Sequence, residues 1–411
     1  MQLLYLLFIG VVLLLFLYYR TADAEGFSDV TKDPVYQAQM KDLNDTYGPG
    51  ATGKRPVDVQ DMEEDEQNLV NFYMLGCRYP GYIGPMMKGH MDADLGIQAA
   101  VNAGCRVFVM DIDYLDKCAP ASYYPRLVVR DIQGKLVMHP DTNQPLCQSP
   151  DHSNLKDLFA KINFYAFSSG QSSDPLVIVL YFHRQPPGAY NSKLVLDYYS
   201  AVAQALAPFQ DRMLRNELDG GTFYRQKQEG RLLINKISDY SGKVLVFSNA
   251  NTTGFRETTA YDTTADLDYM THLRLSYTQT QMGVTENGSG SVFGILQAAE
   301  DFTAIPNDRM AEVSEQTKLR WTICLSRDPS VIVPSDMYDK VTKMGVHCVP
   351  TILFDPAATY LFTDTTFKKH GIIPKPVPLR YIKPPVIIPA APNPSMDAKG
   401  GMLRTPVVPT A

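Results

Sequence analysis

Polar side chains follow each of the longer apolar runs in this sequence, and their types are suited to acid–base and phosphate chemistry. The candidates are Cys77 and Arg78, Asp111 and Asp113, His139 and Asp141, His183 and Arg184, Asn249, Arg274 and Tyr277, Arg327 and Asp328, and Asp355. A lining of mixed acids, bases and cations suits a phosphate or sugar-phosphate ligand better than an apolar one.

The elements that would position these side chains alternate along residues 69–366. Eight β-rich runs occur there, at 71–76, 106–112, 126–139, 176–182, 243–248, 272–277, 320–326 and 348–354. Several are apolar on both faces, as strands covered by helices must be. Helical patterns lie between them, at 94–103, 154–167, 192–214, 292–302 and 335–344.

This alternation predicts an α/β fold of the (β/α)8 TIM-barrel type, in which the polar residues at the carboxyl ends of the strands meet in one site. A doubly wound open sheet is the alternative. No Gly-rich dinucleotide or phosphate loop follows the first run, which disfavours a nucleotide-binding version.

Two quoted segments carry a family resemblance. They are "GIQAAVNAGCRVFVMDIDYLD", a helix leading into a strand that ends in an acidic pair, and "GKLVMHPD", a turn that ends in a histidine. Together they resemble the X-region of phosphatidylinositol-specific phospholipase C and, more broadly, the PLC-like phosphodiesterases. The resemblance implies a mechanism with two histidines, one as general base and one as general acid, and Ca²⁺ or an arginine to neutralise the phosphate.

The resemblance implies roles for individual residues of this chain. His139 falls at the second histidine and Asp111 at one acidic position, so both are candidate catalytic residues. Val109 stands at the other acidic position, and Asp113 would have to join Asp111 as a Ca²⁺ ligand. Tyr181 stands where the family often has a glutamate. His183 has no counterpart in the pattern, and we interpret it as a loop histidine.

The first histidine of the pattern is missing, because "GCRYPGY" places Arg78 at or beside that position. An arginine has no lone pair with which to take a proton, so the two-histidine chemistry should fail. Cys77 or His90 would have to supply another base. Arg78 can still bind a phosphate, as can Arg184 and Arg274. Alternatively, Arg78 pairs with Asp111 as a structural bridge across the barrel mouth.

Both ends of the chain read as extensions of the barrel. Residues 1–20 contain an almost unbroken apolar run, which predicts a single-pass membrane anchor, with a secretory signal cleaved after Ala24 as the alternative. Residues 21–68 form an acidic polar linker. Residues 367–411 are rich in proline and predict an extended tail that docks on a protein partner.

The formal net charge of -6, without a basic cluster, argues against nucleic acid as a partner.

Two functional hypotheses follow. The first is a membrane-attached PLC-like barrel with a degenerate site, a pseudoenzyme that serves as a binding or structural module. Its layout of anchor, domain and proline-rich arm also resembles proteins that link a membrane to a virion shell. The second is an active phosphodiesterase on phosphoinositide or glycerophosphodiester substrates, with His139 as the acid.

Overall fold

The structure of the protein is a computed structural model. It describes residues 34–49, 54–83, 92–114, 126–127, 135–136, 138, 155–168, 171, 173–214, 223–259, 263–287, 293–328, 332–363 and 367–383. The chain divides into two units, Met1–Tyr381 and Ile382–Ala411, and nearly all of the described residues belong to the first.

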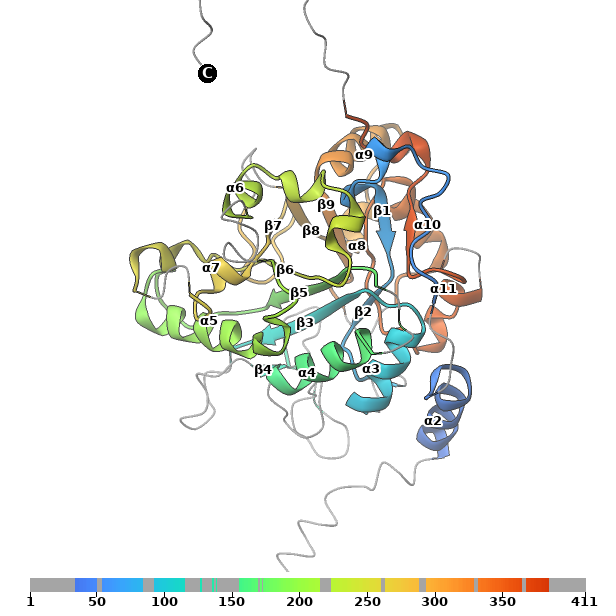
Figure 1. Ribbon diagram of the computed structural model, residues 1–411, viewed down its shortest axis with the longest axis horizontal. Coiled ribbons are helices and arrows are strands. Elements are labelled where there is room, and N and C mark those ends of the chain that lie inside the picture. The colour runs from blue at the N-terminus through green and yellow to red at the C-terminus, as the bar shows by residue number, and fades with distance from the viewer. Residues whose placement is uncertain are drawn as a thin grey trace, which may run out of the picture. The chain divides into compact units, whose positions relative to one another are not determined.

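A curled sheet of seven parallel strands forms the centre of the first unit (Figure 1). In spatial order the strands are β2 (Gly76–Arg78), β3 (Val107–Asp113), β5 (Leu176–Phe182), β6 (Val244–Ser248), β7 (Leu273–Ser276), β8 (Gly294–Ala298) and β9 (Trp321–Leu325). A two-residue strand, β4 (Arg126–Leu127), pairs antiparallel with β3 and lies off this path. The sheet therefore has the α/β, TIM-like architecture that the sequence predicts.

The segment 348–351 lies between the two ends of the sheet. Parallel bridges join Cys348 to Ile323 of β9, and Thr351 to Cys77 of β2. The Cys324 amide donates to the Cys348 carbonyl at 2.9 Å, and the Arg78 amide donates to the Thr351 carbonyl, also at 2.9 Å. This segment thus occupies the place of an eighth strand, and its register fixes the backbone of Arg78 at the carboxyl end of β2.

Helices cover the outside of the strands. In Figure 1, α3, α4 and α5 lie along one side of β2, β3 and β5. The longer helices are α2 (Pro34–Tyr47), α3 (Ala93–Asn102), α4 (Leu155–Ala166), α5 (Lys193–Ala205), α9 (Met310–Leu319) and α10 (Ser335–Lys343). The shorter ones are α6 (Phe223–Gln228), α7 (Leu267–Met270), α8 (Ala299–Thr303) and α11 (Tyr360–Thr363).

The core has two layers, which explains why the strands are apolar on both faces. Along β5, Val177 and Val179 belong to the cluster inside the curled sheet, whereas Ile178 and Leu180 belong to the cluster under the helices. Successive side chains of a strand point to opposite faces. On β3 the inward positions Val107 and Val109 therefore continue into Asp111 and Asp113.

One predicted strand and one predicted helix were wrong. The run 126–139 does not supply a barrel strand in its described part, where β4 is an antiparallel addition to β3. Residues 292–302, expected as a helix, instead contain β8 followed by α8. Gly294 permits this strand, because a Cβ there would lie 2.6 Å from the Arg274 carbonyl oxygen of the neighbouring strand. Short apolar runs do not by themselves distinguish a buried strand from a helix.

Residues before and after the predicted barrel also pack against it. Tyr36 and Leu43 of α2 are buried in the outer core. Strand β1 (Phe72–Met74) pairs antiparallel with β10 (Ile372–Pro374), within the stretch predicted as the extended tail. The predicted anchor, residues 1–20, lies outside the described residues, as does the tail beyond residue 383. Within the described part, no helix is both long and apolar enough to cross a membrane.

The start of α3 provides a test of local structure. The Asp92 side chain accepts a hydrogen bond from the Leu95 amide at 2.9 Å and thereby caps the helix. We expect Asp92→Ala to lower the free energy of unfolding by about 1 kcal/mol, measured by urea denaturation, because one amide at the helix start loses its acceptor. Asp92→Asn retains an acceptor and should stay close to the wild type. An equal loss in both variants would contradict the capping role.

Candidate functional site

Arg78 lies at the carboxyl end of β2, and its side chain is held inside the curled sheet by four hydrogen bonds. Its Nε lies 3.2 Å from both carboxylate oxygens of Asp111, and its Nη2 donates to Asp111 Oδ1 at 2.7 Å. Its Nη1 donates to the carbonyl oxygen of Ser326, just after β9, at 2.7 Å. The Arg78 side chain is only 4% exposed. The structural bridge between Arg78 and Asp111, one of the two alternatives from the sequence, is therefore present.

Asp111 is the centre of this cluster and is fully buried. Besides Arg78, it accepts hydrogen bonds from the Tyr79 hydroxyl at 3.3 Å and from His183 Nε2 at 2.8 Å. Burial raises the pKa of the Asp111 carboxyl. Arg78 and His183 lower this pKa by more than burial raises it, so the net shift is downward. Asp111 is therefore held as a carboxylate. We call Arg78, Asp111 and His183 the strand-end triad.

Aromatic rings enclose the guanidinium of Arg78. Its central carbon lies 5.0 Å from the Tyr79 ring centroid and 5.8 Å from that of Tyr181, within the range of a cation–π contact. Tyr79 adopts a φ of 53°, in the left-handed region that non-glycine residues rarely occupy. Such strain persists only where the surroundings impose it, and here the conformation brings the Tyr79 hydroxyl to Asp111.

Asp113, the second predicted metal ligand, lies beside the triad at the end of β3. Arg184 Nε donates to Asp113 Oδ1 at 3.1 Å, and Arg184 Nη2 donates to the Tyr114 carbonyl at 2.5 Å. Asp113 is fully buried, whereas the Arg184 side chain is 42% exposed. Of the three arginines predicted to bind phosphate, Arg184 is therefore the one that reaches solvent near the triad.

The structure does not bring all the predicted residues together. Arg274 lies on β7 and forms an ion pair with Glu286, which is not a member of the triad. His139 and His90 lie outside the described residues. Cys77 packs in the outer core, on the opposite face of β2 from Arg78. It therefore faces the helices, and the thiol that was considered as a replacement base is directed away from the triad.

His183, interpreted from the sequence as a loop histidine, belongs to this site. The alternation of side chains along β5 could have indicated this. Tyr181 pairs in register with Asp111, and His183 lies two residues further on the same face. The His183 amide also donates to the Ile112 carbonyl at 2.8 Å, which continues the ladder beyond the strand. Among the described residues, His183 is the imidazole that contacts the carboxylate at this end of the barrel.

The residues that the structure describes around Asp111 and Asp113 do not fit a calcium site. Asp111 already faces two cationic or proton-donating groups, Arg78 and His183, and a divalent cation would be repelled by the guanidinium beside it. Asp113 is engaged by Arg184, and the side chain of Val109 has no oxygen atom. Among the residues that the structure describes, no group of three His, Cys, Asp or Glu side chains could hold a metal ion.

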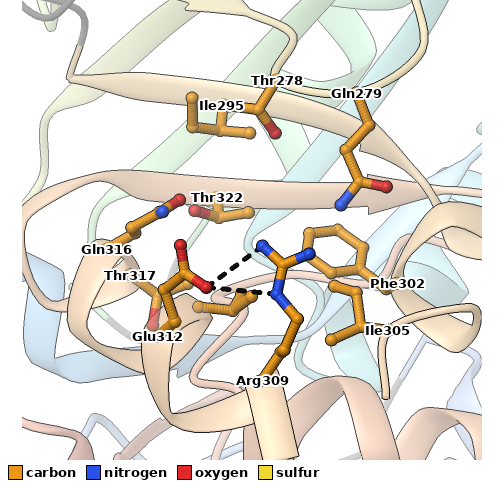
Figure 2. A pocket seen from close by; sticks show the side chains of 11 residues that line it. Thr278, Gln279, Ile295, Phe302, Ile305, Arg309, Glu312, Gln316, Thr317 and Thr322 are labelled. Carbon is orange, nitrogen blue, oxygen red and sulfur yellow. Dashed lines mark hydrogen bonds and ion pairs between the residues drawn. The ribbon is translucent and has the colours of Figure 1, made fainter.

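A separate cavity of about 170 Å³ lies outside the strands, between β8 and β9 and the helices α8 and α9. Its lining includes Ile295, Phe302 and Ile305 (Figure 2). Arg309 and Glu312 also line it and form an ion pair with each other, Arg309 Nη2 lying 3.1 Å from Glu312 Oε2. The guanidinium in this cavity is thus already neutralised, and none of the triad residues lines it.

Comparison with solved structures identifies the class of fold. The structure resembles L. pealei PLC21 with a TM-score of 0.50 at 14% sequence identity, over 78% of this chain and 39% of that one. It also matches S. officinalis PLC21 over 78% of this chain and 39% of that one, with a TM-score of 0.44 at 12% identity. A calcium-dependent phosphoinositol-specific phospholipase C from a Pseudomonas species matches over 75% of this chain and 96% of its own, with a TM-score of 0.44 at 10% identity.

The chain therefore shares its fold with L. pealei PLC21, which agrees with the fold that the sequence resemblance implied. The likeness covers about two fifths of L. pealei PLC21, and at 14% identity it describes the fold alone. No model of a protein family matches the sequence, and no curated protein matches it.

Proposed function

We propose that this protein is a membrane-attached PLC-like barrel whose strand-end site is catalytically weak or inactive, and that it acts as a binding or structural module. The observation that carries the proposal is the position of Arg78. It stands where the family pattern has its general base, and its guanidinium is bound to Asp111 and to the Ser326 carbonyl. A buried guanidinium paired with a carboxylate cannot accept a proton from a substrate hydroxyl.

The ligand in this proposal is a phosphate-bearing lipid or sugar phosphate, which meets Arg184 first. Arg78 is buried and engaged, so a phosphate would have to displace the Asp111 carboxylate to reach it. Arg184 is exposed enough to offer part of its guanidinium while it remains beside Asp113. The proposal further includes membrane attachment through residues 1–20 and a protein partner, such as a virion shell, for the proline-rich tail. The composition of those segments supports it.

A second candidate function is favoured by one contact. His183 Nε2 lies 2.8 Å from Asp111 Oδ1, and a carboxylate that orients an imidazole is an arrangement suited to proton transfer. With His183 as the base and His139 as the acid, the barrel would be an active phosphodiesterase on phosphoinositide or glycerophosphodiester substrates. Arg184, which reaches solvent beside the triad, would then neutralise charge on the phosphate.

The experiment that separates these functions is an assay of the full-length protein against phosphatidylinositol and glycerophosphoinositol, with Ca²⁺ and with chelator. We expect no turnover above background in either condition. If the rest of the catalytic machinery is intact, Arg78→His should raise turnover. Turnover by the wild type that is lost in His183→Ala or His139→Ala would contradict the inactive assignment. His370→Ala is the matched control, because His370 binds the Pro56 carbonyl at the surface, away from the triad.

A further inference from the structure

A second cluster of basic side chains lies at the opposite end of the sheet from the triad. Lys375 follows β10 and is fully buried. Its Nζ lies 2.8 Å from His347 Nε2 and 3.3 Å from the Thr317 carbonyl oxygen of α9. Its backbone amide donates to the Asn71 carbonyl at 2.8 Å. Lys375 therefore joins the segment that contains β10 to the underside of the barrel.

The hydrogen bonds of His347 determine where its proton lies. The Thr322 backbone amide donates to His347 Nδ1 at 2.9 Å, so Nδ1 is an acceptor and carries no hydrogen. The hydrogen of the neutral ring is then on Nε2, which faces the Val70 carbonyl at 2.7 Å and Lys375 Nζ at 2.8 Å. An ammonium group has only hydrogen-bond donors. In a charged Lys375, an N–H of the ammonium would therefore face the N–H of His347 Nε2, with no acceptor between them. The geometry requires a neutral amine whose lone pair faces the imidazole.

The elements around the pair offer no counter-charge in their described parts. On β1, the Tyr73 ring lies 5.9 Å from Lys375 Nζ, and its hydroxyl donates to the Thr342 carbonyl. The acidic groups of these elements pair elsewhere. Glu66 pairs with Arg380, and on α9 Glu312 pairs with Arg309 and Glu315 with Lys318. Burial lowers the pKa of both Lys375 and His347. A proton taken up by either side chain would create a buried charge without a partner.

We propose that Lys375 and His347 form a neutral two-base latch that fastens the segment 367–381 to the barrel and releases it when the pair takes up a proton. The latch bridges four parts of the fold, because its contacts reach β10, α9, β9 and the turn that precedes β1. Release exposes Lys375 to water, where its charged form is solvated. Uptake of a proton and opening of the segment are therefore coupled.

The sign of the pH dependence follows from this coupling. A base whose pKa is lower in the closed state than in the open state binds more protons when open. Opening therefore becomes more favourable as the pH falls below the open-state pKa of lysine, about 10.4, until the closed-state pKa of Lys375 is reached. In that window the opening equilibrium constant rises about tenfold for each pH unit if one proton is taken up. His347 adds to the effect only below about pH 6.5.

Hydrogen–deuterium exchange of peptides from residues 367–383, in the full-length protein, tests the latch. After correction for the intrinsic exchange rate, we expect the opening constant to rise about tenfold from about pH 9 to about pH 8. Lys375→Met fills the same space without a titratable group and should remove this dependence. Lys340→Met is the matched control, because Lys340 binds the backbone carbonyls of Thr303 and Ile305 and should leave the dependence unchanged.

Two outcomes would overturn the proposal. One is a wild-type opening constant that does not change with pH, a result that requires no variant to fold. The other is a Lys375→Met protein that keeps the wild-type pH dependence.

Discussion

Replacing Asp111 by alanine should lower the free energy of unfolding by about 3–5 kcal/mol, the cost of leaving a buried guanidinium without its partner. Asp111 is fully buried, and Arg78 is 4% exposed, so water cannot replace the lost carboxylate without opening the end of the barrel. Equilibrium denaturation in urea measures the loss, with circular dichroism to confirm that the variant folds.

Two further variants isolate the contribution of the ion pair. Asp197→Ala removes the carboxylate of an exposed pair with Lys193 and should change stability by less than about 0.5 kcal/mol. The double variant Arg78→Met with Asp111→Leu removes both charges and should recover much of the loss. If Asp111→Ala costs no more than Asp197→Ala, the buried pair does not hold this end of the barrel together.

The same pair makes stability depend on pH in acid. The pKa of Asp111 is lowered in the folded state, so its ionised form contributes stability above the unfolded value of about 3.9. This contribution is lost as the pH falls through the lower folded-state pKa. The difference between the wild type and Asp111→Ala should therefore shrink below about pH 4.

Trp321→Ala should also lower the free energy of unfolding by about 3–5 kcal/mol, because it removes the largest fully buried side chain of the barrel interior. Trp321 begins β9, and its ring packs edge-on against Phe247 of β6 with centroids 4.7 Å apart. The cavity left by alanine would lie between β9 and β6, and side chains of both strands would lose packing contacts. Urea denaturation again measures the loss.

Trp321→Phe is the informative partner variant. The indole Nε1 is buried and has no hydrogen-bond partner among the described residues, so phenylalanine removes an unsatisfied donor while it keeps most of the volume. We expect this variant to lose less than about 1.5 kcal/mol. Phe164→Ala, at a side chain that is 67% exposed, should have almost no effect. If Trp321→Phe lowers the free energy of unfolding as much as Trp321→Ala does, the indole N–H has a hydrogen-bond acceptor outside the described residues.

Most of the barrel strands and the helices between them were predictable because their signals are local. The β5 run "LVIVLYF" is apolar on both faces, and the pattern at 192–214 contains α5. Strand β8 was missed because "GILQAAEDF" contains both a strand and the start of a helix, and only its pairing between β7 and β9 separates them. The amino-acid sequence of one segment does not show which strands it will pair with.

The sequence by itself determined that an arginine, Arg78, stands where the family resemblance implies a base, and that Asp111 and Asp113 share one face of their strand, since residue type and alternation are properties of the chain itself. Only the tertiary structure decided that Arg78 turns to Asp111 and to the Ser326 carbonyl, and that His183 completes the triad. It alone placed Lys375 against His347, 28 residues apart in the chain. The physical reason is that a buried polar group takes its partners from whichever strands the closed sheet brings together, and their order in the sequence does not specify those distances.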